Sequence, residues 1–434
     1  MTTEAVVINK IGIALATDSA VTISGSGKTK VFDTGDKLFE LDLQHPVAIM
    51  INGNMDYLGV PWELIIKDFR ERENPERKDT LQETLVQFLD FTTSHKASGA
   101  DSELRYIRGL GAEECEAIKQ KVSRRIFKED KEPDGDAGDY LATLIVDEAN
   151  RRREYFNRVK KADSLSGLTA KHLLATYSVE LGKLIRQLFA PVELSRARAL
   201  VVKRMIVSAL LSSRASSFST GIIIAGYAPG DLFPSLAIAE IDSSVAGRLK
   251  YSVGEGLTVD RTENPGRVIS FAQTDVADRI LSGADHKFMR KTADFIKESL
   301  EKSKDSVVKA LEKVGVSGDG ASSVFDTVIR ATTSEFKTTF WKDAREDFQK
   351  DFNEMVALMP KQDIIELAEA IVSITAIERK ASSEQATVGG PVDVAFVTRH
   401  EGFVWIRRKH YFEKDLNPRY FRRRFSEQKP GEAA

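Results

Sequence analysis

The second residue of the sequence is a threonine, and its position gives it a specific chemistry. Met1 precedes Thr2, and because Thr2 is small, removal of Met1 is expected to leave Thr2 at the N-terminus. A threonine hydroxyl is a weak nucleophile unless a base is held beside it. An N-terminal threonine carries its own base, because the α-amine titrates near ~7.7–8 and can accept the hydroxyl proton. Many proteins begin Met-Thr, so this prediction of acyl transfer depends on the residues that follow.

The segment after Thr2 resembles the opening of a proteasome β-subunit. That family begins with two threonines, crosses a hairpin, and places an aspartate sixteen residues after its catalytic threonine, as Asp18 is placed after Thr2. Asp18 precedes Ser19, and Thr22 stands where the family has a threonine whose backbone pairs with substrate. The Asp-Lys-Leu triplet around Lys37 resembles the segment of the family's catalytic lysine, after a slightly longer loop.

Later segments continue the resemblance in the same order along the chain. Gly53, in an Asn-Gly-Asn turn, matches the residue whose amide contributes to the family's oxyanion hole. Residues 222–242 resemble the central hairpin of the family, and residues 363–406 resemble its closing helix and hairpin. The Thr-Val-Gly-Gly-Pro-Val-Asp stretch at 387–393 is most similar to the bacterial proteasome-like proteins called Anbu. The resemblance covers just under half of the chain.

The sequence also departs from the family's pattern. Proteasome subunits carry a supporting serine before the closing helix and an aspartate–serine pair after it. This chain has Ala-Gln-Thr-Asp at 272–275 and Ser-Glu-Gln-Ala-Thr at 383–387. Thr274 and Glu384 are the nearest substitutes, but no spacing places them. The helical segments near 96–213 and 278–350 have no counterpart in ordinary subunits, so they argue against the family's stacked-ring assembly for this chain.

The resemblance implies a peptidase of the N-terminal nucleophile (Ntn) hydrolase class. The Thr2 hydroxyl would attack a peptide or amide carbonyl, with the Thr2 α-amine as its base. A Lys37 ammonium would favour the neutral amine and the developing oxyanion, and Asp18 would hold Lys37 charged and oriented. The Gly53 amide would donate to the oxyanion, and water would then cleave the acyl-enzyme. Ser19 and Thr22 are expected on the substrate-binding side, and no cofactor or metal is expected.

Three functions fit these residues. The first is a self-processed threonine peptidase that acts on peptides or proteins as a homo-oligomer, with an ATP-dependent unfoldase left open as a partner. The second keeps this mechanism but takes a small amide as substrate. The third is an inactive proteasome-like scaffold whose helical insertions bind a partner. Taken singly, Asp18 could instead cap a turn, and Lys37 could be a solvated residue of an edge strand.

Composition argues against several other classes of protein. The 63 basic and 65 acidic residues give a net charge of −2, so binding of nucleic acid or an anionic membrane through charge is not expected. One cysteine, Cys115, excludes an internal disulfide framework, and the six histidines lack metal-binding spacing. No apolar run reaches ~18 residues and no signal peptide is seen, so a cytoplasmic protein is expected. The Gly-Ser-Gly-Lys-Thr run at 25–29 lacks the first glycine of a phosphate-binding loop.

Short apolar or β-branched runs alternate with long, charged, helix-like segments. Hydrophobic spacing predicts an amphipathic helix over 363–379, and loops are expected at 24–27 and 318–320. Because the strand segments cannot each bury a face alone, we expect one α+β domain, a four-layer αββα Ntn-hydrolase sandwich with two helical insertions. Strands are predicted at 5–8, 11–16, 20–23, 37–41, 47–51, 221–227, 236–241, 268–271, 392–398 and 403–407.

These segments predict the following division of the chain. Residues 1–95 form the first half of the core, 96–216 a helical insertion, 217–277 a core hairpin and strand, 278–350 a second helical insertion, 351–412 the closing helices and hairpin of the core, and 413–434 a polar C-terminal tail. On this division the core is built from three separate stretches of the chain, and each helical insertion connects one core stretch to the next.

Overall fold

The structure of the chain is a computed structural model. It describes residues 3–25, 28–42, 45–72, 78–96, 99–129, 136–272, 275–315, 317–381, 388–419 and 422. Helices and antiparallel sheets share the fold, so the expected α+β class is confirmed. None of the helices in these ranges is long and apolar enough to cross a membrane.

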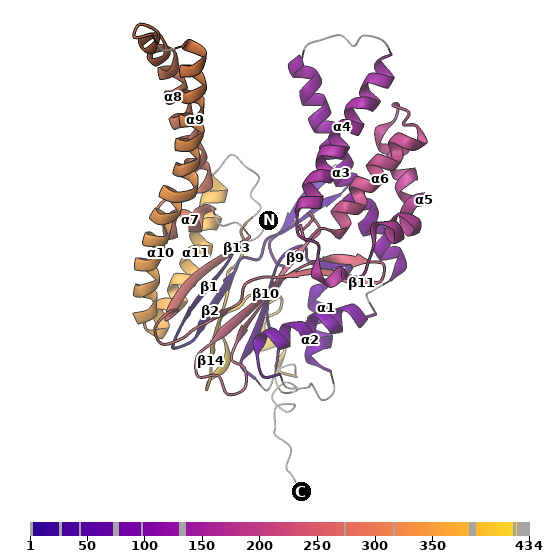
Figure 1. Ribbon diagram of the computed structural model, residues 1–434. Coiled ribbons are helices and arrows are strands. Elements are labelled where there is room, and N and C mark those ends of the chain that lie inside the picture. The colour runs from indigo at the N-terminus through magenta and orange to yellow at the C-terminus, as the bar shows by residue number, and fades with distance from the viewer. Residues whose placement is uncertain are drawn as a thin grey trace.

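Strands from three distant parts of the chain form the first sheet (Figure 1). β1 and β2 form the expected hairpin, and the Asn9 side chain accepts the Ile11 N–H at 2.9 Å in its turn. The closing hairpin of β14 and β15 is also present. In order across the sheet, the antiparallel strands are β13 (Gly266–Ala272), β1 (Thr3–Asn9), β2 (Ile13–Thr17), β14 (Asp393–Thr398) and β15 (Gly402–Arg407).

The second sheet is built from two pairs of predicted strands and two strands that the sequence did not predict. In order, its strands are β11 (Arg248–Val253), β10 (Ser235–Val245), β9 (Thr220–Gly226), β6 (Val47–Gly53) and β5 (Leu38–Glu40), and β12 (Leu257–Thr258) pairs with β10. The expected pair β9–β10 is confirmed, and β5 pairs with β6. β11 was missed because charged residues interrupt its apolar positions. It follows a turn at Ala246 and Gly247, whose φ angles are 51° and 72°.

The two sheets pack face to face. Val6 of β1 lies in one apolar cluster with Met50 of β6 and Ile223 of β9, so side chains of both sheets fill the space between them. Ala5, the next residue of β1, lies in a different cluster with Ile371 of α11 (Lys361–Ala381). Successive side chains of a strand point to opposite faces, so β1 is buried on both faces.

Helices cover both outer faces of the paired sheets. α11 and the end of α10 (Trp341–Leu358) pack on the first sheet, with α7 (Asp275–Ser282) beside them. α1 (Trp62–Arg70) and α2 (Leu81–Ser94) pack on the second sheet. α2 begins at a capping box in which the Thr80 side chain accepts the Glu83 N–H. The layers therefore follow the order helices, sheet, sheet, helices.

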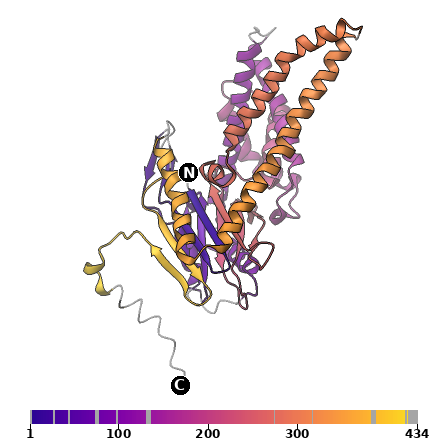
Figure 2. The same cartoon turned by 90° about the vertical axis from the view of Figure 1, so that its left-hand side faces the viewer.

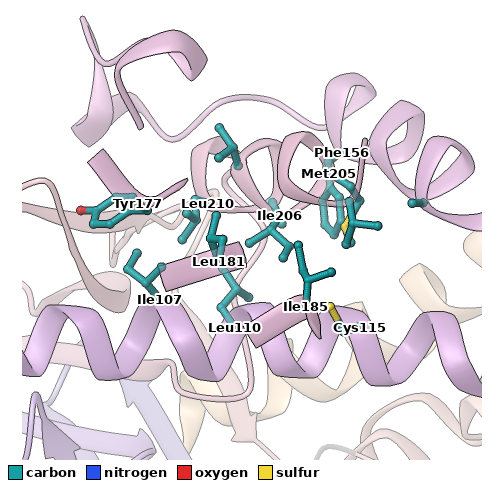
Figure 3. Close-up of a cluster of buried hydrophobic side chains, with 14 of the residues drawn as sticks. Ile107, Leu110, Cys115, Phe156, Tyr177, Leu181, Ile185, Met205, Ile206 and Leu210 are labelled. Carbon is teal, nitrogen blue, oxygen red and sulfur yellow. The ribbon is translucent and has the colours of Figure 1, made fainter. Parts of the chain in front are cut away.

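Four helices within the segment 96–216 have an apolar core of their own (Figure 3). They are α3 (Ala100–Glu129), α4 (Ala137–Arg158), α5 (Ala170–Phe189) and α6 (Arg196–Leu211). Leu181 and Ile185 of α5 contribute to that core with Cys115 of α3, which is fully buried. Burial raises the pKa of the Cys115 thiol to about 12, so this residue packs as a small apolar group.

The second helical segment differs in detail from the prediction. Two long helices, α8 (His286–Glu312) and α9 (Gly318–Glu335), extend well beyond the sheets (Figures 1 and 2). The loop expected at 318–320 is the first turn of α9, because Ser317 caps the helix by accepting the Gly320 N–H. The expected boundary at residue 350 falls inside α10, whose Val356 is buried in the core.

The remaining elements are short. Ser24 and Gly25, expected in a loop, are the last residues of β3, and residues 26 and 27 lie outside the described ranges. These elements are the strand pairs β3 (Val21–Gly25) with β4 (Lys28–Phe32) and β7 (Asp56–Tyr57) with β8 (Val60–Pro61), the 3-10 turns η1 (Asp163–Leu165) and η3 (Lys414–Leu416), and the π-helical turn η2 (Phe336–Phe340).

A buried ion pair fastens the first helical segment to the second sheet. Lys250 of β11 and Asp242 of β10 are 2.8 Å apart, with side chains only 2% and 4% exposed. The Tyr106 hydroxyl of α3 donates to Asp242 at 2.8 Å, and the Ser216 hydroxyl also donates to it. The Lys250 ammonium donates to the Arg214 carbonyl at 3.2 Å. Both charges are therefore partnered, which is the condition for burying them.

We expect Lys250→Met to lower the free energy of unfolding by about 3–5 kcal/mol, because it leaves the Asp242 carboxylate buried without its cation. Urea titration of the purified variant measures this change. Lys160→Met is the matched control, because its ion pair with Asp163 is solvent-exposed and worth little. An unchanged urea midpoint for Lys250→Met would contradict the anchoring role.

Candidate active site

The structure brings Asp18 and Lys37 together in a dry environment. The Lys37 Nζ lies 2.7 Å from Asp18 Oδ1, and both side chains are 0% exposed. The interpretation of Lys37 as a solvated residue of an edge strand is therefore wrong. Burial lowers the pKa of Lys37, and the nearby Asp18 carboxylate partly opposes this effect.

Backbone donors from three parts of the chain hold the Asp18 carboxylate. The Thr3 N–H donates to Oδ1 at 3.1 Å, so this oxygen joins the first described residue of the chain to Lys37. The Ala20 N–H donates to Oδ2 at 3.2 Å, as expected for an aspartate at a turn, and the Gly389 N–H donates to the same oxygen at 3.1 Å. The carboxylate is thus fixed at the point where β1, β2 and the segment before β14 meet.

The segment that carries Lys37 is fixed on both sides. Lys37 directly precedes β5, and its carbonyl accepts the Ile51 N–H of β6 at 2.9 Å. The preceding residue, Asp36, pairs with Lys409 at 3.0 Å, and Lys409 also pairs with the buried Asp393. Lys409 therefore joins the residue before Lys37 to the first residue of β14.

Gly53 ends β6 in a backbone conformation that suits glycine. Its φ is +81°, and a Cβ built on it would lie 2.6 Å from the Ser219 carbonyl oxygen. The following turn is anchored, because Asn54 N donates to the Ser219 carbonyl at 2.9 Å and the Thr220 hydroxyl donates to the Asn54 carbonyl at 2.7 Å. The Trp62 indole N–H in turn donates to Thr220 at 2.9 Å.

The other predicted residues have different surroundings. The Ser19 hydroxyl donates to the Pro391 carbonyl at 2.7 Å, so it is engaged with the segment before β14. Thr22 lies in β3 opposite Val31, and its hydroxyl has no hydrogen-bond partner among the described residues. Thr2, Thr274 and Glu384 lie outside the described residues, as does the whole stretch 382–387.

Sequence reasoning missed Glu4, a fully buried carboxyl beside this pair. Its Oε2 accepts the Asn52 side-chain N–H at 3.2 Å, and its Oε1 is buried with no hydrogen-bond partner in the described part of the chain. Burial raises the pKa of Glu4 to about 8, although Lys37 and the Asn52 and Thr17 side chains act in the opposite direction, and Asp18 acts in the same direction. A glutamate inside the apolar run at the start of β1 is the one signal that could have revealed it.

No described group of three or more His, Cys, Asp or Glu side chains is arranged to hold a metal ion. Asp18 contacts Lys37 and the backbone N–H groups described above. The Asp18 carboxylate, the Lys37 ammonium and the protonatable Glu4 carboxyl are all buried. Such an arrangement is suited to proton transfer.

Comparison with solved structures gives a weak likeness, and the other two comparisons find no match. No protein-family model matches the chain, and no curated protein matches it. A solved structure described as an Anbu (Gly-1) mutant from Hyphomicrobium sp. strain MC1 is similar over 100% of both chains, with a TM-score of 0.25 and 9% sequence identity. A TM-score of this size establishes neither a shared fold nor a shared function.

We expect Gly53→Ala to be more destabilising than Gly247→Ala in urea titration. Both glycines have positive φ, which costs an alanine roughly 1 kcal/mol, but a Cβ on Gly53 also meets the Ser219 carbonyl whereas one on Gly247 meets open space. Equal losses of stability in the two variants would show that the turn at Gly53 can move aside freely.

We expect the free energy of unfolding to fall as pH rises from 4.5 towards 8. In this window Glu4 is ionised in the unfolded chain but protonated in the folded one. The unfolded state therefore binds fewer protons, and raising the pH stabilises it relative to the folded state. Glu4→Gln should match the wild type near pH 5 and become the more stable protein by pH 7.5, as urea midpoints would show. Glu263→Gln, at an exposed position, should keep the wild-type slope, and a Glu4→Gln slope equal to it would contradict the assignment.

Proposed function

We propose that this chain is a proteasome-like N-terminal threonine hydrolase that cleaves peptide bonds after Met1 is removed. One observation carries the proposal: the buried Lys37–Asp18 pair, whose shared Oδ1 also accepts the Thr3 N–H. Thr3 is the covalent neighbour of Thr2, so this oxygen connects the lysine to the residue that adjoins the proposed nucleophile. An ion pair kept away from water interacts more strongly with a reacting group than one at the surface.

The order of layers also supports the Ntn-hydrolase sandwich that we propose for the core. Two antiparallel sheets pack face to face, with α11 on one outer face and α1 and α2 on the other. β1 and β2 lie at the centre of the first sheet, and β6 and β9 lie inside the second. On this proposal, the helices α3–α6 and α8–α9 are additions to the sandwich.

In the proposed mechanism, the Thr2 hydroxyl attacks the carbonyl carbon of an amide bond, and its proton passes to the Thr2 α-amine. The Lys37 ammonium favours the neutral form of that amine and attracts the oxyanion. Asp18 opposes the loss of the proton from Lys37 that burial promotes. The amine returns the proton to the departing nitrogen, the carbon–nitrogen bond breaks, and water releases the acyl group from Thr2.

The Gly53 amide is the donor that we propose for the oxyanion. Gly53 follows Asn52, and the turn after it is held through Ser219 and Thr220, so its backbone is fixed before substrate arrives. A preorganised donor of this kind contributes about 3 kcal/mol to the transition state in other hydrolases. The absence of a side chain at residue 53 lets a substrate backbone approach closely.

The first test is the intact mass of the purified protein before and after treatment with a peptide epoxyketone. We expect Met1 to be absent before treatment, which leaves the Thr2 amine free, and a single covalent adduct after it, because the Thr2 hydroxyl and amine react together with this probe. Thr2→Ala should give no adduct. Lys37→Met should slow adduct formation by about 100-fold or more, because the amine loses its neighbouring charge, while Lys10→Met, an exposed residue, should react as the wild type does.

The outcomes separate the proposed hydrolase from its alternatives. Retention of Met1 would overturn the proposal, because the threonine amine would not exist. A free Thr2 that reacts with a small β-lactone but not with the peptide probe would indicate a hydrolase of small amides. A free Thr2 that reacts with neither would favour a scaffold without activity.

A further inference from the structure

Glu4 is placed where a charged side chain is costly. It lies in β1 between Thr3 and Ala5, is 0% exposed, and pairs across the sheet with Thr17 and Phe271. One carboxyl oxygen, Oε2, accepts the Asn52 N–H, whereas Oε1 has no hydrogen-bond partner in the described residues. An ionised carboxylate with a buried, unsatisfied oxygen would be strongly unfavourable. A protonated carboxyl avoids that cost and can donate a hydrogen bond from the same oxygen.

The charged groups that act on Glu4 are Lys37 and Asp18. They form a 2.7 Å pair whose charges cancel. If Glu4 were ionised as well, the site would carry one excess negative charge. That charge would oppose an oxyanion and would favour the protonated form of a nearby amine, because like charges repel and opposite charges attract.

Glu4 also connects this pair to the turn at Gly53. The bond from Asn52 Nδ2 to Glu4 Oε2 joins the first sheet to the second, directly beside the proposed oxyanion donor. Asn52 lies opposite Gly221 in β9, and a Cβ on Gly221 would come within 2.6 Å of Asn52 Oδ1. The lack of a side chain at Gly221 therefore leaves room for the Asn52 amide to be aimed at Glu4.

We propose that Glu4 is a positioning residue for the threonine chemistry, one that couples the Lys37–Asp18 pair to the Asn52–Gly53 turn and, while neutral, leaves that pair without excess charge. This inference rests on the proposed function. It assigns Glu4 no contact with substrate. Its proton is held in place during turnover, and loss of that proton at alkaline pH switches the site to a less reactive state.

The test is the pH dependence of acylation by a peptide epoxyketone, followed by intact mass, for the wild type and Glu4→Gln. Gln keeps an oxygen acceptor for Asn52 but cannot ionise. Since the pKa of Glu4 is about 8, roughly nine-tenths of the wild type carries neutral Glu4 at pH 7 and one-tenth at pH 9. We therefore expect the ratio of the Glu4→Gln rate to the wild-type rate to rise about tenfold between pH 7 and pH 9.

Asn52→Ala provides the second variant, in case Glu4→Gln folds poorly. It removes the hydrogen bond that lowers the pKa of Glu4, so the alkaline fall in rate should move to higher pH. Glu263→Gln, an exposed carboxyl, should keep the wild-type profile. A merely structural Glu4 would lower the rate equally at every pH.

The outcomes distinguish this inference from the proposed function. A rate ratio that is constant between pH 7 and pH 9, with adducts in both proteins, would overturn the role of Glu4 and leave the hydrolase standing. No adduct in the wild type at any pH would overturn the proposed peptidase, and the role of Glu4 with it. A tenfold rise for Glu4→Gln, or the alkaline displacement for Asn52→Ala, would support both.

Discussion

The ion pair between Lys37 and Asp18 is the constraint on which the rest of the candidate site depends. Removing both charges from water costs several kcal/mol per ion, and the cost is recovered only when geometry and further hydrogen bonds are good. Asp18 meets this condition with N–H donors from Thr3, Ala20 and Gly389 as well as the lysine. Removal of any one of these segments would leave a buried charge short of partners, so the pair requires nearly complete tertiary structure.

The same principle recurs at the junction of the helices with the second sheet. There Asp242 and Lys250 are buried, and donors and acceptors from α3 and from the segment after α6 satisfy them. The Lys37–Asp18 pair lies where strands meet, whereas the Lys250–Asp242 pair lies where helices join a sheet. In each case the polar contacts specify which segments meet, while the surrounding apolar side chains supply most of the favourable free energy.

The sequence predicted the regular elements well where the pattern of side chains was simple. Apolar runs predicted β1, β2, β6, β9 and β14, because these strands are buried along most of their length. Apolar residues at helical spacing predicted α11, because one face of that helix is buried. β11 was missed since Arg248 and Lys250 stand at positions that a buried strand rarely gives to charges. The glycines at 318 and 320 predict a loop, whereas the structure has the first turn of α9 there because Ser317 caps the helix.

The candidate site was only partly predictable for a physical reason. The Asp18–Lys37 proximity came from resemblance and spacing, but the partners that make their burial tolerable come from far along the chain. The only local signal of Glu4 is a glutamate at the start of an apolar strand, and its role depends on Asn52 in the other sheet. Contacts between distant segments are decided by packing, which no short stretch of sequence contains.

The hydrogen bond from Gly389 to Asp18 has a consequence for the chain while it is being synthesised on the ribosome. Its two ends are 371 residues apart, and at 5–20 residues per second a ribosome needs roughly 20–70 s to add that length. During this interval the nascent chain lacks one of the donors that make the acid–base pair stable. In a newly made chain the Lys37–Asp18 pair therefore lacks this donor until the segment before β14 has been synthesised.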